Sequence, residues 1–456
     1  MLSTTHERSI NVAVQAAVLT AGKVVQQRRR QQQRGRRRGS SLGRMAAQRR
    51  QRTQVKDIYQ QLGPVYFKRA YRMKYASFKK LARKLHNGIM RASGTNRFSK
   101  NYIHNGRITP SVRLACALRY FAGGSPYDIM TTYCLGHSDT INSIWYVVEA
   151  INSHPEFQIS YPARHEEQRA IAEGFRKVSD ANFDCCAGAI DGILIWIHKP
   201  TEDDCNKAGC SSGKFFCGRK HKFGLNCQAV CNVRGKFLDL SIVYPGSTSD
   251  CLAFEGMSLF RKLEGGLLAP GLCFFGDNAY LNSLSIFMAT PFSAVSGGSK
   301  DAYNFYQSQL RIRIECAFGM LTHRWAILRS AIPMNISLKR TIALVIALAK
   351  LHNFCIDEKD LKVPAVPPID ELRTEMQGGV PLETTTMTGR NPIPRQLIGG
   401  GNHFDDMDRA SRRRRVRQYE HEAQASHQQL PRDRLHDLIA EANLRRPVPT
   451  TRTTRI

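Results

Sequence analysis

No run of apolar residues in this chain approaches the ~20 residues that a membrane-spanning helix needs, so we expect no such helix. The segment 10–25 is fairly apolar and weakly resembles the core of a signal peptide. Gln15 and Lys23 interrupt it, however, and a run of arginines follows it. We therefore expect neither a secretory leader nor a membrane partner.

A disulfide framework is also lacking. The thirteen cysteines are odd in number and scattered along the chain, which is typical of proteins in a reducing compartment. The nearest approach to a metal knuckle contains no Cys-x-x-Cys pair and consists of Cys205, Cys210, Cys217 and His221. Ordinary reduced cysteines are the favoured interpretation, and a metal role for this group is left open.

Acidic residues are absent from residues 28–52, which hold eleven arginines. The whole chain has a formal net charge of +30, and this segment concentrates it. Segregated basic charge indicates a polyanionic partner, of which nucleic acid is the usual one and an acidic membrane surface the alternative. The compact clusters Arg28–Arg30 and Arg36–Arg38 are of the kind that direct nuclear import or bind phosphate, although a solvated tail has the same composition.

The 456 residues allow about two or three domains. We expect a disordered Arg/Gln-rich basic arm over residues 1–60 and a helical region over 61–158. An α/β catalytic domain is expected over 159–360. Residues 361–456 are expected to be a linker and a mobile basic tail, because proline, threonine and glycine clusters follow Asp360.

Residues 109–152 predict a helix-turn-helix arrangement. Thr109-Pro110 is a typical helix start, and Gly123-Gly124 ends that helix. A short second helix follows Ser125-Pro126, and a third is expected after a cap at Ser138.

The outward face of the third helix would then offer polar side chains to base edges, namely those of Thr140, Asn142, Ser143 and Tyr146. A small helical bundle that only packs on the catalytic domain is the alternative, because this face carries no Arg or Lys.

The following region alternates strands with helices. Residues 188–197 predict a central strand, since they are apolar on both faces apart from one acid. Further strands are expected over 225–233, 236–244 and 271–276, and helices from Ser249 or Asp250 through Phe260 and over 301–328 and 338–355. Three meander strands followed by alternating strands and helices are consistent with an α/β sheet of the ribonuclease H kind, but spacing alone does not fix that choice.

Three acids stand out in this region. Asp191 interrupts an apolar strand, Asp277 ends another, and Glu315 lies in a helical pattern. A carboxylate in an apolar strand is costly unless something pairs with it, so convergence on divalent metal would explain all three. Taken singly, Asp277 could cap a turn and Glu315 could pair with Arg311 four residues earlier. Asp191 has no equally simple alternative.

Asp250 is a fourth acid, which could either cap a helix or bind metal. It follows Pro-Gly-Ser-Thr-Ser, and we expect it to cap the helix that starts at Cys251 rather than to bind metal. On this interpretation its side chain faces away from the other three acids.

Several motifs together resemble the PIF/Harbinger transposases and the Harbinger-transposase-derived nucleases over roughly residues 109–356. These motifs are Gly-Ala-Ile-Asp-Gly at 188–192, Phe-Cys-Gly-Arg-Lys at 216–220, Asn-Cys-Gln-Ala-Val at 226–230, Tyr-Pro-Gly-Ser-Thr-Ser-Asp at 244–250, Gly-Asp-Asn-Ala-Tyr at 276–280, the segment 311–325 and Leu-His-Asn-Phe-Cys at 351–355. The resemblance implies a ribonuclease H-like DDE domain with Asp191, Asp277 and Glu315 at the positions of the catalytic triad.

The resemblance also implies DNA cleavage and strand transfer at transposon ends, together with a Myb-like partner protein. We accordingly expect a nuclear DNA endonuclease that acts on transposon terminal repeats as a homo-oligomer. The alternative is a domesticated DNA-binding protein that has lost cleavage. The chain departs from the family pattern at Ile193-Leu194, at Asn278-Ala279 and at Cys316, where Thr-His, Ser-Gly and Arg are usual.

The expected chemistry explains why carboxylates are needed. Two Mg²⁺ ions about 3.5–4 Å apart can stabilise charge on the entering and leaving oxygens of a phosphodiester. Carboxylates are hard oxygen ligands that also neutralise the ions, and Mn²⁺ could replace Mg²⁺. Asp191 on a central strand would bridge the metals, and Asp277 and Glu315 would each hold one side.

Overall fold

The protein is described from a computed structural model that covers residues 52–94, 108–280, 287–293, 295, 297–360 and 430–447. The arginine clusters at 28–38 and most of the expected basic arm lie outside these residues, as does the expected linker over 361–429. The first described helix, α2 (Val55–Tyr71), starts inside the range expected for the arm.

Helices alone make up the first described part of the chain. After α2 these are α3 (Tyr75–Ala92), α4 (Pro110–Phe121), α5 (Pro126–Tyr133), α6 (His137–Ser153), η2 (Pro155–Phe157) and α7 (His165–Arg176). The start of α4 agrees with the sequence expectation, because the Thr109 side chain accepts a hydrogen bond from Val112 N at 3.3 Å with Pro110 in the first turn. The expected cap at Ser138 is wrong, since α6 begins at His137 after Gly136.

The outward polar face expected on α6 is present only in part, because Asn142 is exposed and Tyr146 is half-buried. Thr140 and Ser143 are fully buried, and their hydroxyls donate to the carbonyls of Gly136 and Asp139 one turn back. Helix α6 packs against α3, α4, α5 and α12, so it is the central helix of a bundle. Of the four expected positions, Thr140 and Ser143 therefore face the interior of the bundle, and Asn142 faces solvent.

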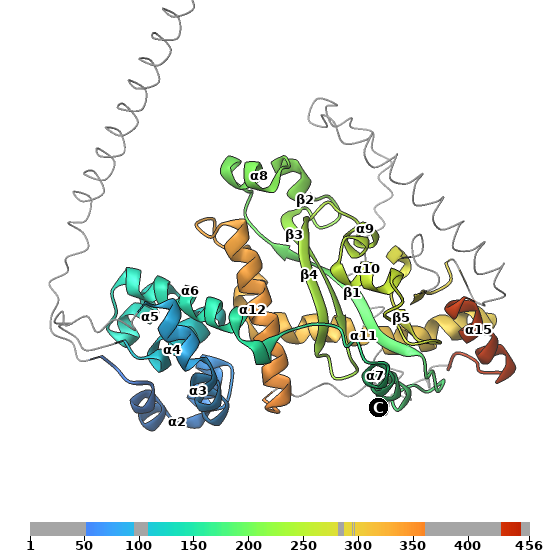
Figure 1. Ribbon diagram of the computed structural model, residues 1–456, viewed down its shortest axis with the longest axis horizontal. Coiled ribbons are helices and arrows are strands. Elements are labelled where there is room, and N and C mark those ends of the chain that lie inside the picture. The colour runs from blue at the N-terminus through green and yellow to red at the C-terminus, as the bar shows by residue number, and fades with distance from the viewer. Residues whose placement is uncertain are drawn as a thin grey trace, which may run out of the picture. The chain divides into compact units, whose positions relative to one another are not determined.

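A mixed sheet follows the helices. Its strands are β1 (Cys186–Trp196), β2 (Phe216–Cys217), β3 (Lys222–Cys231), β4 (Phe237–Pro245), β5 (Cys273–Phe275) and β6 (Met288–Ala289). Their order is β4–β3–β1–β5–β6, with the short β2 on the end of β3 (Figure 1). The pairs β1–β3 and β3–β4 are antiparallel, whereas β1–β5 and β5–β6 are parallel. The expectation of a central first strand is therefore confirmed.

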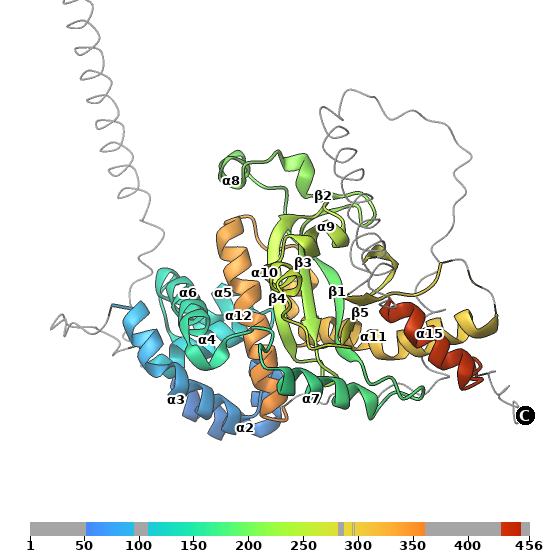
Figure 2. The same cartoon turned by 45° about the vertical axis from the view of Figure 1, so that its right-hand side comes forward.

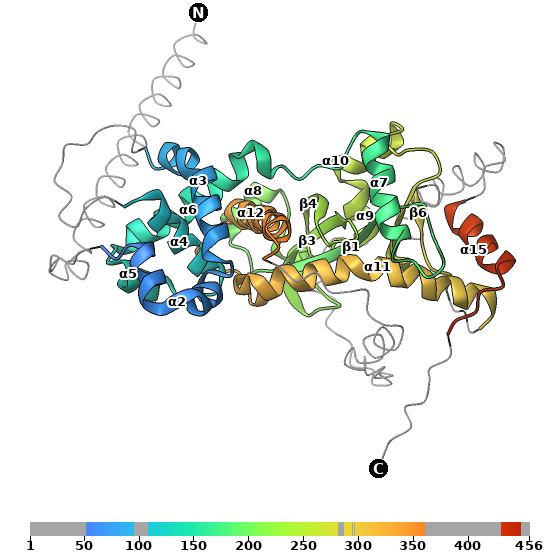
Figure 3. The same cartoon turned by 90° about the horizontal axis from the view of Figure 1, so that it is seen from below.

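The remaining helices cover the two faces and the margin of this sheet. They are α8 (Glu202–Ala208), α9 (Asp250–Glu255), α10 (Ser258–Glu264), α11 (Gly298–Arg324), α12 (Leu338–Asp357) and α15 (Pro431–Glu441), with short turns η3 (Ser212–Phe215), η4 (Asn278–Tyr280) and η5 (Ala326–Arg329). Helix α11 crosses one face, and α7, α9 and α10 lie on the other (Figure 3).

Alternation along β1 gives each face its own apolar core. Ala189 packs with α11 and the helical region, whereas Ile190 packs with Phe254 and Phe260 of the opposite face. Helix α12 joins the two regions, since it contacts both α6 and β4. The isolated acid in β1 therefore sits in a strand covered on both sides.

Helix α15 lies within the range expected to be a mobile tail. It packs against α11 and β6, and its Leu435 and Ile439 are buried. Figure 2 shows α15 beside α11. Arg434 donates to the Gly271 carbonyl at 2.8 Å, and Arg446 pairs with Asp301 at 2.9 Å. The sequence did not predict this packing, because a long and mostly polar segment separates α15 from the rest of the domain.

No helix in the described ranges combines the length and the apolar character that a membrane crossing requires.

Candidate active site

Asp191 and Asp277 stand level with each other on neighbouring strands. The parallel register of β1 and β5 ends with Ala189 opposite Phe275, and each acid follows its strand's last paired residue by two positions. Neighbouring strands lie about 4.8 Å apart. The sheet thus brings together two carboxylates that are 86 positions apart in the sequence.

Glu315 reaches the same region from α11, which packs across β1. Arg311 lies one turn before it, and its Nη1 donates to Glu315 Oε1. The same nitrogen is 3.9 Å from Asp191 Oδ2. Arg311 is largely buried, with only 16% of its side chain exposed, whereas 47% of the Glu315 side chain is exposed. Arg311 therefore lies beside Asp191 and Glu315, and the charge of Asp277 also acts on it.

The pKa values of Asp191 and Asp277 are both raised in this environment. The pKa of Asp191 is raised to about 7, chiefly by burial. The negative charge of Asp277 contributes to this rise, and that of Glu315 contributes less. The Gly192 N–H, which donates to Asp191 Oδ1 at 2.8 Å, and Arg311 act in the opposite direction. Burial also raises the pKa of Asp277. The cluster holds more negative charge than Arg311 alone neutralises.

Local hydrogen bonds orient Asp277. Its Oδ1 accepts from the Ala279 N–H at 2.9 Å, so the turn-capping role weighed for it is real and coexists with its place in the cluster. Gly276 precedes it, and a β-carbon there would lie 2.6 Å from the Met288 sulfur. A side chain at Gly276 would therefore displace the segment that carries Asp277.

Gln307 is a residue that sequence reasoning missed. It is fully buried on α11, and its amide donates to the carbonyls of Gly276 at 2.8 Å and Ala289 at 3.0 Å. It lies one turn before Arg311 and two before Glu315, so one face of α11 fixes the ends of β5 and β6 as well as the cluster. The available signal was the spacing of Gln307, Arg311 and Glu315 at intervals of four residues, which places them on one face of the helix.

The expectation that Asp250 caps its helix and faces away is wrong. Ser249 is the cap, accepting from Leu252 N at 3.4 Å. The Asp250 Oδ1 instead accepts from Gln228 Nε2 at 2.8 Å and Asn226 Nδ2 at 3.0 Å, both on β3. Its charge raises the pKa of Asp277, so the two carboxylates are near neighbours. The available signal was the pair of amides at 226 and 228, which share one face of an apolar strand and need partners.

Gly192 makes this approach possible. A β-carbon at this position would lie 2.2 Å from Asp250 Oδ1 and 2.4 Å from Gln228 Nε2. Next to it, Tyr280 donates its hydroxyl to Gln228 Oε1. Burial raises the pKa of Tyr280, and the charges of Asp191, Asp250 and Asp277 do so too, which keeps that hydroxyl protonated. A buried polar chain thus supports the acids from the α9 side.

The described residues contain no group of three or more His, Cys, Asp or Glu side chains already arranged as a metal site, and this includes Cys205, Cys210, Cys217 and His221. No disulfide joins the described cysteines. The donor set around Arg311 nevertheless suits a hard divalent cation, because it consists of carboxylates.

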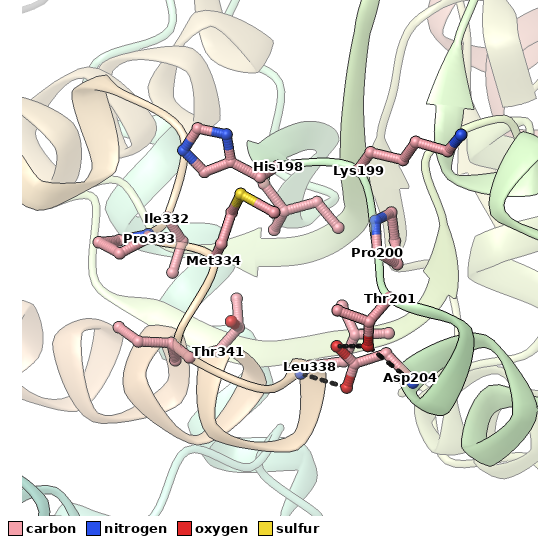
Figure 4. A pocket seen from close by; sticks show the side chains of 12 residues that line it. His198, Lys199, Pro200, Thr201, Asp204, Ile332, Pro333, Met334, Leu338 and Thr341 are labelled. Atoms are coloured by element: carbon pink, nitrogen blue, oxygen red, sulfur yellow. Dashed lines mark hydrogen bonds between the residues drawn. The ribbon is translucent and has the colours of Figure 1, made fainter. Parts of the chain in front are cut away.

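A small pocket of about 20 Å³ lies elsewhere, beyond the end of β1 (Figure 4). His198, Lys199 and Met334 line it, and Asp204 below them accepts from the Leu338 N–H at 3.3 Å. That bond ties α8 to the start of α12, and Thr201, the cap of α8, holds Asp204 in place with a hydrogen bond at 3.1 Å. The pocket is lined by none of the clustered acids and is too small for a nucleotide.

Comparison with known proteins agrees with this geometry. Residues 190–353 match the family model described as DDE superfamily endonuclease. The chain is 24% identical over 253 residues to the protein named Putative nuclease HARBI1 from Bos taurus and from Homo sapiens, which is 55% of this chain and 68% of each relative. It is also 24% identical over 262 residues to Protein ALP1-like from Arabidopsis thaliana, covering 54% of this chain and 61% of that protein.

No solved structure matches the chain. The matched segment runs from the residue before Asp191, through β3 to β6 and α11, to Asn353 of α12, so it includes the whole acid cluster. Residues 190–353 are therefore similar to the DDE superfamily endonuclease domain, and the longer segment shared with the curated relatives is similar to the protein named Putative nuclease HARBI1.

Proposed function

We propose that this chain is a metal-dependent DNA endonuclease with Asp191, Asp277 and Glu315 as its catalytic acids. One observation carries the proposal: acids from two strands and a helix gather around Arg311 inside a nuclease domain. A surface ion pair of Arg311 with Glu315 would not require a second, largely buried carboxylate whose pKa is raised to about 7.

The strand order supports a ribonuclease H-like fold for this domain. Three antiparallel meander strands, β1, β3 and β4, are followed by two strands parallel to β1 on its other side. This places the first acid on the central strand and the second beyond its neighbour. The helical region over 61–158 would then support the domain, and a helix-turn-helix role for it is not favoured by the buried face of α6.

Carboxylates of Asp191, Asp277 and Glu315 would hold two Mg²⁺ ions, which stabilise charge on the entering and leaving oxygens of a phosphodiester. Asp191 is oriented for this by the Gly192 N–H, and Asp277 by the Ala279 N–H. Arg311 supplies positive charge to the cluster and pairs with the most exposed acid. Mn²⁺ would serve in place of Mg²⁺.

The natural substrate would be DNA at transposon terminal repeats, where cleavage precedes strand transfer. We also propose that the chain acts in the nucleus as a homo-oligomer with a Myb-like DNA-binding partner. The support for these points is the family resemblance and, for import, the arginine clusters at 28–30 and 36–38. Each is open to direct test by mass measurement, co-purification and localisation of a tagged chain.

The decisive experiment is a nicking assay on supercoiled plasmid that carries candidate terminal inverted repeats, with and without the Myb-like partner. We expect open-circular product with Mg²⁺ or Mn²⁺ and none with EDTA. Asp191→Asn, Asp277→Asn and Glu315→Gln should each abolish it. Nicking that survives all three changes would show a contaminating nuclease and would overturn the proposal.

A DNA-binding protein without cleavage remains the second candidate. The observation that favours it is the Arg311–Glu315 pair, which occupies one of the acids that metal would need. Salt-dependent DNA binding without nicking under every metal and partner condition would select it.

A further inference from the structure

A basic cleft lies at the C-terminal end of α11, where it meets α2. Its volume is about 500 Å³, and apart from Val65 every lining residue is a cation or a histidine: Lys68, Arg69, Arg72, His323 and Arg324. Within the described part of the chain no carboxylate lines it. Neighbouring Asp360 is directed elsewhere, with its Oδ1 3.6 Å from Lys74. The cleft therefore concentrates positive charge without an opposing acid.

One buried and one half-buried arginine, Arg324 and Arg72, line this cleft. Arg324 is 92% buried, since its exposed fraction is 8%, and its guanidinium donates to the backbone carbonyls of Arg72 and Asp360. Its Nε and that of Arg72 are buried without a hydrogen-bond partner among the described residues. Backbone carbonyls are neutral, so they do not cancel the charge of the Arg324 guanidinium. Arg324 can therefore still attract an anion.

The backbone at Arg72 indicates that this arrangement is imposed. Arg72 ends α2 with φ of 60°, in the left-handed region that a residue with a side chain rarely adopts. Burial lowers the pKa of Arg72, and the charges of Arg329, Arg324 and Arg119 lower it further. Four guanidinium groups thus repel one another at this point, and a bound anion would relieve that repulsion.

A continuous exposed stripe links the cleft to the acid cluster. Glu315, Gly319 and His323 recur every four residues on α11, and all three are exposed. Nothing lies within 4 Å of the position of a β-carbon on Gly319, so a phosphate backbone can approach the helix closely there. The distance along α11 from Glu315 to Arg324 is about 14 Å, roughly four base pairs of duplex.

We propose that this cleft binds backbone phosphates of duplex DNA about four base pairs from the bond held at the acid cluster. Lys68 and Arg69 provide exposed contacts, and the half-buried Arg72 and the buried Arg324 lie beneath them. The proposal rests on the proposed function for the identity of the polyanion. Phosphate contacts of this kind position the duplex and read no sequence.

The test measures the affinity of full-length protein for a 30-base-pair duplex in EDTA, so that cleavage plays no part. We expect the double variant Lys68→Gln, Arg69→Gln to bind at least about tenfold more weakly at moderate salt. The slope of log K against log salt should become shallower by about 2, because each phosphate contact contributes about 0.9. Both side chains are exposed, so the melting temperature should not change.

The matched control is Arg261→Gln, Lys262→Gln, an exposed basic pair on α10 across the sheet from α11. It should leave both affinity and slope unchanged. Equal effects of the two double variants, or none from Lys68 and Arg69, would overturn the proposal. Loss of binding to anionic phospholipid vesicles with unchanged DNA affinity would also overturn it, in favour of a membrane surface. DNA binding through the cleft without any nicking would refute the endonuclease while leaving the cleft intact.

Discussion

Arg311 Nη1 lies 3.9 Å from Asp191 Oδ2, which makes a buried guanidinium the counter-ion of the central acid. The same group pairs with Glu315. Arg311 therefore stands where positive charge is needed and where a divalent metal would also be attracted. Both Arg311 and a bound metal ion would neutralise the negative charge of these acids. The effect of metal on stability should therefore depend on whether Arg311 is present.

The first prediction follows from this sharing. Arg311→Met keeps most of the packing volume but leaves Asp191 and its neighbours without a cation, so the variant should be less stable than wild type in EDTA by about 3–5 kcal/mol. Saturating Mg²⁺ or Mn²⁺ should raise its melting temperature more than it raises that of wild type. An equal metal-induced rise in both proteins would show that Arg311 and metal do not act on the same charges.

The second prediction concerns pH and Asp191. The folded pKa of about 7 lies above the ordinary value of 3.8, so the folded state holds a proton that the unfolded chain releases. The free energy of unfolding of metal-free protein should fall between about pH 4 and pH 7 because of this group. Asp191→Asn removes the effect, and its stability relative to wild type should rise across that window to an upper bound of about 4 kcal/mol.

Denaturant titrations at a series of pH values in EDTA provide the measurement. His352 serves as a check on the opposite sign, because burial lowers its pKa to about 4. That group lowers stability as the pH falls below about 6.5, in both proteins alike. A variant Asp191→Asn that is less stable than wild type at every pH would contradict the assigned shift.

The third prediction tests the close approach at Gly192. Gly192→Ala would place a β-carbon 2.2 Å from Asp250 Oδ1, so Asp250 and Gln228 must move apart. We expect a loss of about 1–3 kcal/mol in the free energy of unfolding and a large loss of nicking. Gly218→Ala is the control, since nothing lies within 4 Å of its β-carbon position. Similar stability of both variants would refute the packing at Gly192.

The fourth prediction concerns the support of Asp277. Gln307→Met fills a similar volume but leaves the carbonyls of Gly276 and Ala289 without their donor. The free energy of unfolding should fall by about 1–3 kcal/mol. Because Gln307 would only position Asp277, added metal should restore part of the lost nicking. A stable variant that cleaves normally would show that this amide is dispensable.

The strands and the long helix near the acids were predictable because their apolar residues recur at clear strand or helix spacing. The expected strands over 225–233 and 236–244 are within three residues of β3 and β4, and the long helix through Glu315 is α11. The expected helix through Phe260 breaks into α9 and α10 at Gly256, where a β-carbon would lie 2.1 Å from the Tyr244 hydroxyl. Periodicity does not report such a tertiary contact.

Side-chain direction was harder to predict than element position. The sequence could not show that Asp250 turns back to Asn226 and Gln228, because the choice depends on a long-range hydrogen-bonding partner. The same limitation explains the error at α6, where burial of Thr140 and Ser143 follows from packing against other helices. The expected convergence of three acids depended on motif resemblance as well as on spacing.

Glu315 gives the most direct test of the catalytic assignment. Glu315→Gln keeps the size of the side chain but removes the charge that a metal ligand must supply. Its side chain is 47% exposed, so loss of the pair with Arg311 should cost at most about 0.5 kcal/mol of stability. The melting temperature, DNA affinity in EDTA and Mg²⁺-dependent nicking should be measured in parallel. We predict nicking reduced by orders of magnitude with folding and DNA binding retained, and unchanged nicking would contradict the assignment.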